Sequence, residues 1–125
     1  MISFNHVAVF VSDLEKSGRF YEQILELKKI DEPFKLGKHI WFHIGDHCQL
    51  HLIADKPKKD NVHWHFSFSV PDVAAFAQKL EAADISYGDL GDTSKNNICF
   101  RPDGIKQIFF QDPDGYWIEA NDDRY

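Results

Sequence analysis

An internal repeat links the two halves of this sequence. A histidine opens an apolar segment at His6 and again at His65, 59 residues later, and an aspartate follows seven residues after each, at Asp13 and Asp72. Both aspartates stand just before a segment with helical periodicity. Repeated units of this kind bury a continuous core by packing against each other. The repeat therefore predicts two similar modules around one shared site.

A second pair of repeated segments carries further candidate ligands. Ile40–His51 and Ile108–Glu119 each begin with three apolar residues and contain an aspartate at the same place. Glu119 lies 68 residues after His51, so the second half has about nine additional residues between its repeated segments. The ligand-type residues at repeated positions are His6, His51, His65 and Glu119. Imidazole and carboxylate together are typical of a site for Zn, Ni, Mn or Fe(II).

Hydrophobic alternation, helix caps and turn residues predict the same order of elements in each half. In the first half we expect strands over 3–11, 27–30, 38–44 and 47–54, with a helix from the Ser12–Asp13 cap to about Leu25. In the second half we expect strands over about 62–70, 85–89, 106–111 and 116–121, with a helix from the Pro71–Asp72 cap to about Ala83. The charged segment 55–61 is the predicted linker, and the polar stretch 91–97 is the predicted mobile loop.

The predicted fold class is therefore α+β, with residues 1–125 forming a single domain of two βαβββ modules, at about 1–55 and 62–123. A chain of 125 residues with 43% hydrophobic residues is long enough to bury a core without disulfides.

Side chains two residues apart lie on the same face of a strand, so the histidines can be assigned to faces. In the first half, His6 shares a face with Phe4, Ala8 and Phe10, and His51 shares one with His47 and Gln49. Trp41 lies on the same face as His39 and His43. In the second half, His65 shares a face with His63, Ser67 and Ser69. Glu119 lies within an apolar strand, where an unpaired carboxylate is costly, so a cation partner is expected. We expect His39, His43, His47 and His63 to lie beside the site or at the surface.

Charge and cysteine content narrow the classes of partner and location. The net charge is −6 and no basic stripe occurs, so nucleic acid and anionic membranes are not expected partners. No apolar run approaches the ~18 residues of a membrane-spanning helix, and no basic leader begins the sequence. The two cysteines, Cys48 and Cys99, fit a reducing compartment. A cytoplasmic location is expected.

The pattern resembles the vicinal oxygen chelate superfamily, which includes glyoxalase I, extradiol dioxygenases, fosfomycin-resistance enzymes and bleomycin-resistance proteins. The resemblance is carried by the segments His6–Tyr21, His65–Leu80 and Phe109–Glu119, which together span nearly the whole chain. It implies curved mixed sheets that form a cup around one divalent metal ion, with Zn or Ni expected first and Fe, Mn or Co as alternatives. It also implies that His6, His51, His65 and Glu119 are the metal ligands.

Glyoxalase-I-like proteins resemble the chain most, with departures that concern the substrate. Glutathione-dependent members commonly have glutamate at the position of His51, and an arginine that anchors glutathione at the position of Phe10. They also commonly have asparagine at the position of Asp55. These departures argue against glutathione while leaving the metal set in place. Arg101 is the candidate cation for an anionic substrate, and Phe10 and Trp41 are further candidate substrate-binding residues.

The resemblance implies a metal-dependent lyase or isomerase that acts on a small substrate with neighbouring oxygens. Glu119 is the candidate base, and His51 is the alternative base if it is not a ligand. One rival is a dioxygenase, in which His6, His65 and Glu119 hold Fe(II). Another rival is a non-enzymatic binding or resistance protein that holds a flat ligand in an aromatic cup of Trp41, Trp64, Phe110 and Trp117. Small members are commonly homodimers, and the modules can pair within one chain or between two.

Overall fold

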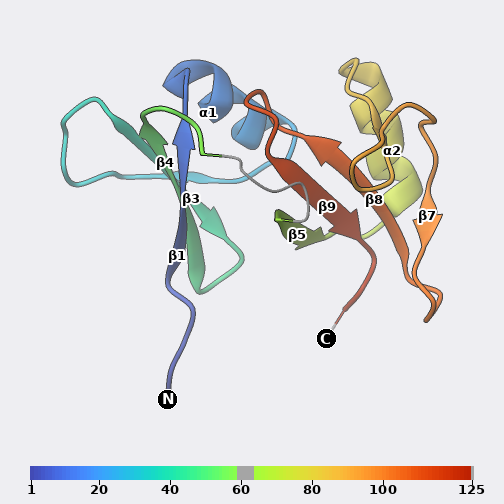
Figure 1. The fold of residues 1–125 in the computed structure, drawn as a ribbon. Coiled ribbons are helices and arrows are strands. Elements are labelled where there is room, and N and C mark those ends of the chain that lie inside the picture. The colour runs from blue at the N-terminus through green and yellow to red at the C-terminus, as the bar shows by residue number, and fades with distance from the viewer. Residues whose placement is uncertain (59–63, 125) are drawn as a thin grey trace. The chain divides into compact units, whose positions relative to one another are not determined.

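The computed structural model describes residues 1–58 and 64–124. The chain divides into two compact units, Met1–Lys58 and Lys59–Tyr125 (Figure 1). Residues 59–61 of the predicted linker, the predicted strand start at 62, and His63 lie outside the described residues.

The first unit is a four-stranded mixed sheet with one helix. Its strands are β1 (His6–Val11), β2 (Lys29–Ile30), β3 (His39–Ile44) and β4 (Cys48–Ala54), and they are arranged in the order β1-β4-β3-β2. β1 runs parallel to β4, while the other neighbours are antiparallel. β1 begins at His6 rather than at residue 3, because its pairing with β4 starts at the His6–Gln49 register.

The helix α1 (Leu14–Gln23) covers the apolar face of this sheet. Its N-cap is Asp13, whose side chain accepts a hydrogen bond from the Lys16 backbone amide and satisfies one otherwise unpaired donor. Phe20 and Tyr21 are buried, and the Tyr21 ring lies 6.5 Å from that of Phe42 on β3. Burying a large apolar side chain is worth about 1.5–3 kcal/mol, so this helix–sheet contact holds the unit together.

The second unit repeats this plan around a five-stranded mixed sheet. β5 (His65–Ser69), β9 (Trp117–Asn121), β8 (Lys106–Gln111) and β6 (Tyr87–Gly88) are neighbours in that order, and β7 (Cys99–Phe100) also pairs with β8. β5 runs parallel to β9, as β1 does to β4. The helix α2 (Val73–Ala82) is capped by Asp72, which accepts from the Ala75 amide, and its Phe76 ring lies 5.6 Å from that of Phe110.

The polar stretch predicted as a mobile loop makes several local hydrogen bonds. Asp89 and Asp92 form an isolated antiparallel bridge, and the Asn96 side chain accepts from the Tyr87 amide. The stretch then leads into β7, which sequence reasoning did not predict. A two-residue strand is too short to show alternation, so nothing in the sequence distinguishes it from loop.

The fold class is confirmed as α+β with two modules of mixed sheets, the second with one strand more than βαβββ. In both units the apolar face of the sheet packs on the helix, and the opposite face carries the histidines and Glu119. No helix in residues 1–58 or 64–124 is long and apolar enough to cross a membrane.

Candidate functional site

His6 and His51 are brought together in the first unit by the parallel pairing of β1 and β4. His51 stands opposite Ala8, two residue pairs along from the His6–Gln49 pair, so both histidines lie on the face away from α1. Their rings are stacked, with centroids 4.2 Å apart and planes 14° from parallel. Trp41 on β3 stacks on the other side of His51, at 3.8 Å and 4°.

The surroundings of His51 favour its neutral form. The residue is only 9% exposed, and its Nε2 lies 2.8 Å from Oε1 of Gln49. Burial is the main cause that lowers the pKa of His51, and the nearby charges of His6 and His39 lower it further. Neutral imidazole is the form that binds metal ions or accepts a proton.

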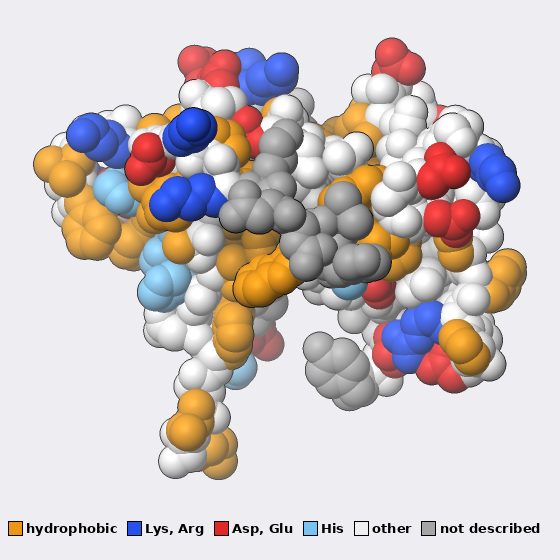
Figure 2. All heavy atoms as spheres, viewed as in Figure 1, with side chains coloured by type: hydrophobic (Ala, Val, Ile, Leu, Met, Phe, Trp, Pro, Cys, Tyr) orange, Lys and Arg blue, Asp and Glu red, His pale blue; other side chains and the backbone are white. Residues whose placement is uncertain are grey.

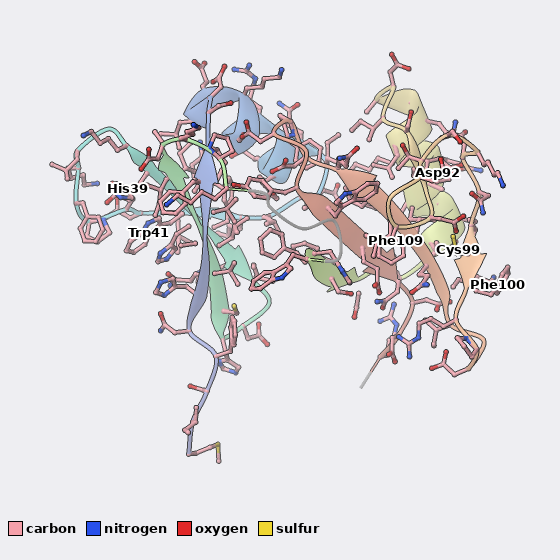
Figure 3. The ribbon with its side chains drawn as sticks, in the orientation of Figure 1. His39, Trp41, Asp92, Cys99, Phe100 and Phe109 are labelled. Carbon is pink, nitrogen blue, oxygen red and sulfur yellow. The ribbon has the colours of Figure 1, made fainter. Side chains whose placement is uncertain are left out.

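The same face of the first unit extends to an aromatic group at the β2–β3 loop. Phe34 packs edge-on against the rings of both His39 and Trp41, which lie on one side of β3 (Figure 3). Figure 2 shows hydrophobic side chains gathered with histidine over this loop, where Phe34 and Leu36 are exposed. Within the part of the chain that the structure describes, buried Nδ1 of His39 and Nε1 of Trp41 have no hydrogen-bond partner. Such atoms are commonly satisfied by water or a ligand.

His65 and Glu119 form the corresponding pair in the second unit. Nε2 of His65 lies 3.3 Å from Oε1 of Glu119, and the Phe109 ring packs edge-on against His65 at 5.4 Å. Glu119 is only 8% exposed. Its other oxygen, Oε2, accepts hydrogen bonds from the Ser67 hydroxyl at 3.0 Å and from Nδ2 of Asn121. The buried carboxylate therefore has polar partners on both oxygens.

The two pairs occupy equivalent positions in the two sheets. Trp41 stands opposite His51 on neighbouring strands, and Phe109 stands opposite Glu119 in the same way. Ala8 is the parallel-strand neighbour of His51, and Ser67 is that of Glu119. The repeat seen in the sequence is thus a repeat of strand register.

The sequence pattern of the Glyoxalase/Bleomycin resistance protein/Dioxygenase superfamily matches residues 3–120. The chain belongs to this superfamily. It is 30% identical to "Glyoxylase I 4" of Arabidopsis thaliana, over 95% of this chain and 70% of that protein. It is 31% identical to "Metallothiol transferase FosB" of Shouchella clausii, over 94% and 77% of the two chains.

A solved structure supports the fold. The structure titled "Oxidase ChaP-H2" aligns with a TM-score of 0.81 and 24% identity, over 99% of this chain and 95% of that one. At this identity the likeness concerns the fold alone.

Each unit has side chains of the types that bind divalent metal ions, and the described residues of each hold one such pair. Among residues 1–58 and 64–124, no group of three or more His, Cys, Asp or Glu side chains is arranged to hold a metal ion. The polar sheet face of the first unit carries the nitrogen donors of His6 and His51, and that of the second carries the nitrogen and oxygen donors of His65 and Glu119, which are donor types typical of Zn and related ions. A ring nitrogen binds a metal within the plane of its ring, so the nearly parallel rings of His6 and His51 would have to turn to share one ion.

The candidate substrate residues have different surroundings. Phe10 shares the His6 face, and the ammonium of Lys58 lies 5.4 Å from its ring centroid. The Arg101 guanidinium donates to Asp103 at 2.5 Å and to Asp123 at 3.0 Å, so two carboxylates neutralise it. Trp64 is 80% exposed, while Trp117 is buried on the Glu119 face of β9.

The prediction that Phe110 belongs to an aromatic cup is wrong. Phe110 is fully buried on the helix side of its sheet, against Phe76, and its neighbour Phe109 faces His65 instead. Three consecutive apolar residues, Ile108 to Phe110, show no alternation, so the face of each was ambiguous. The repeat contained the missing signal, since Phe109 is the equivalent of Trp41. Ser67, Asn121 and Gln49, which bond to the candidate ligands, also follow from two-residue spacing.

Proposed function

We propose that this chain is a metal-dependent lyase or isomerase, similar to glyoxalase I, that acts on a small substrate with two neighbouring oxygens. The observation that carries the proposal is the equivalence of the pairs His6–His51 and His65–Glu119, each on the polar face of its own sheet. In a superfamily whose relatives include proteins named glyoxylase I and metallothiol transferase, this is the donor set expected for catalysis.

His6, His51, His65 and Glu119 would hold the metal ion when the two units assemble into one domain. Zn or Ni is the expected ion, with Fe, Mn or Co as alternatives. The bound ion would supply Lewis-acid polarisation of the substrate oxygens.

Glu119 is the proposed base. A carboxylate beside the reacting carbon can take a proton from the carbon next to a carbonyl and return it to the neighbouring carbon, which completes an isomerisation without another reagent. Its burial keeps bulk water away from the proton in transit. His51, whose lowered pKa favours its neutral form, is the alternative acceptor.

Other residues on these faces would bind the substrate. Trp41 and Phe10 offer apolar surface beside the His6–His51 pair, and the buried Nε1 of Trp41 is available to donate a hydrogen bond to a substrate oxygen. Arg101 stays a candidate for an anionic group, although binding there would require exchange with Asp103 or Asp123.

Metal analysis of the purified protein tests this proposal directly. The wild-type protein should retain about one divalent ion per chain, and His6→Ala and His65→Ala should each lose most of it. His47→Ala is the matched control, because His47 is an exposed histidine immediately before β4 and its loss should leave the ion bound. The metal-loaded protein should isomerise hemithioacetals of methylglyoxal with small thiols. Equal metal content in all four proteins would contradict the proposed ligand set.

A dioxygenase is the second candidate, favoured by the surroundings of His51. That ring is stacked between His6 and Trp41 and contacts Gln49, so it has partners without a metal. His6, His65 and Glu119 alone would form the two-histidine, one-carboxylate set of non-haem iron enzymes. Iron in the purified protein and oxygen uptake with catechols would favour this reading. Tight binding of a flat apolar compound without metal would favour a binding or resistance protein.

We also propose that the protein is a homodimer. The exposed apolar side chains Phe34, Leu36 and Trp64 offer surface that a second copy would cover. Light scattering at micromolar concentration should give about twice the chain mass of 14.5 kDa. A mass equal to that of one chain would contradict the dimer.

A further inference from the structure

The two oxygens of the Glu119 carboxylate have different surroundings. Oε2 accepts hydrogen bonds from the Ser67 hydroxyl and from Nδ2 of Asn121, and Nδ2 also donates to the Ser67 oxygen at 2.9 Å. Oε1 lies 3.3 Å from Nε2 of His65. One oxygen is thus tied to its own sheet, and the other lies beside a second candidate ligand.

The direction of these hydrogen bonds is fixed by the backbone. Oδ1 of Asn121 accepts from the Asp123 amide at 3.0 Å, which settles the orientation of the Asn121 side chain. Both hydrogens of Nδ2 are then directed at Ser67 and Glu119. Because an amide nitrogen cannot accept a hydrogen bond, Oε2 is the acceptor of the bond from Asn121.

Burial makes this arrangement a stable one. Asn121 is 5% exposed and Glu119 is 8% exposed, so little water competes for these bonds. Hydrogen bonds to a charged oxygen are about twice as strong as neutral ones. The Ser67–Asn121 pair therefore holds Oε2 in place and leaves Oε1 as the oxygen with capacity for another partner.

The first unit provides an internal comparison. Ala8 and Ile53 are the register equivalents of Ser67 and Asn121, and there the candidate ligand is His51. Neither alanine nor isoleucine has a side-chain donor, yet the strands pair in the same way. The fold of the module therefore does not need polar residues at the positions of Ser67 and Asn121. Their donors occur where the candidate ligand is a carboxylate and not where it is a histidine.

We propose that Ser67 and Asn121 are positioning residues that clamp Oε2 of Glu119, so that Oε1 is the atom that binds the metal and exchanges the substrate proton. This inference rests on the proposed function. It assigns a single-oxygen mode of binding and one reacting atom to Glu119.

Metal affinity of the full chain tests the clamp. We expect Ser67→Ala and Asn121→Ala to weaken Co²⁺ binding, measured by chelator competition, by about 10–100-fold, as typifies loss of an outer hydrogen-bond partner. The visible absorption bands of bound Co²⁺ should also change, because the carboxylate orientation changes. Ser67→Thr keeps the hydroxyl and should restore wild-type affinity and spectrum. Ser69→Ala, on the same strand and face, is the matched control and should stay within about twofold of wild type.

A second measurement does not depend on metal. In the metal-free protein, the side-chain amide NMR signals of Asn121 should shift in Ser67→Ala and in Glu119→Ala, and should stay unchanged in Ser69→Ala. Wild-type affinity and spectrum in both alanine variants would overturn the clamp while leaving the proposed function intact. If the wild-type chain binds no metal, the proposed function fails, and the amide signals still decide whether the clamp exists: unshifted signals would overturn it.

Discussion

Replacing Glu119 by glutamine should do more than remove one charge, because the neighbours of the carboxylate decide how the new amide is oriented. Ser67 and Asn121 both donate to Oε2. An amide fits only if its carbonyl oxygen takes that place, which puts its NH₂ group where Oε1 lies beside His65. The reverse orientation would set the NH₂ group against the NH₂ group of Asn121.

The size of this preference follows from the cost of an unmade hydrogen bond. Leaving a buried donor unsatisfied costs about 1–3 kcal/mol, which corresponds to a preference of roughly 5–150-fold for the first orientation. In that orientation the amide nitrogen has no lone pair for a metal ion. Affinity should therefore fall by more than the roughly 10–100-fold typical of an outer partner. Loss of the base should lower kcat by about 10²–10⁴-fold, or about 2.7–5.5 kcal/mol in the barrier.

Chelator competition and steady-state kinetics on Glu119→Gln measure both effects. Glu15→Gln is the matched control, because its exposed side chain undergoes the same change of charge on α1, far from the sheet face. Metal affinity within about twofold of wild type, together with a kcat reduced less than about tenfold, would refute the reasoning on both ligand and base.

Three further outcomes can be checked. A β-carbon at Gly18 would lie 2.7 Å from Cδ1 of Ile40, the far end of a flexible and only partly buried side chain, which would have to move. This cost should offset part of the roughly 1 kcal/mol by which alanine favours a helix over glycine. Ile40→Val removes the clashing atom, so Gly18→Ala should be more stabilising in that background in a thermal-unfolding double-mutant cycle, and additivity within about 0.5 kcal/mol would contradict the clash. Burial and the Asp89 hydrogen bond raise the pKa of Cys99 from 9.0 to about 12, so its thiolate is scarce at pH 8. Alkylation of Cys99 should be up to ~10³-fold slower than for an ordinary thiol and should accelerate as pH rises toward 12, whereas a plateau near pH 9 by peptide mapping would refute the shift. The glutathione hemithioacetal of methylglyoxal should be a poor substrate, because Phe10 stands where related enzymes have a cation that anchors glutathione. Such an anchor is worth roughly 1.5–3 kcal/mol, or about 10–100-fold in affinity. A kcat/KM near ~10⁷ M⁻¹s⁻¹ would show that another group anchors the substrate.

The repeat allowed much of each module to be predicted, because it constrains pattern and register together. Asp13 and Asp72 were recognised as helix caps and act as such. Two-residue spacing placed His51 with Gln49 and separated both from the buried Leu50. These predictions held because one face of each strand is apolar and the other is not, which fixes the face of every residue between.

Other features depend on contacts that a linear pattern does not contain. Phe109 and Phe110 are equally apolar, and only the pairing of β8 with β9 decides which one meets His65. The orientation of the Asn121 amide depends on one backbone hydrogen bond from Asp123. Metal binding, the identity of the base and the assembly of the two units stay predictions, because each concerns an event that involves more than one module.

The unequal surroundings of the two repeated ligand positions restrict how this chain can evolve. A glutamate introduced at His51 would meet Ala8 and Ile53, neither of which can donate a hydrogen bond from its side chain. The new carboxylate would lack counterparts of the Ser67 and Asn121 donors, and the Gln49 side chain, which now contacts His51, would be its neighbouring amide. Exchange of histidine for glutamate with the same hydrogen bonds therefore requires coordinated changes at positions 8, 51 and 53. The second module already has the combination at its equivalent positions, as Ser67, Glu119 and Asn121.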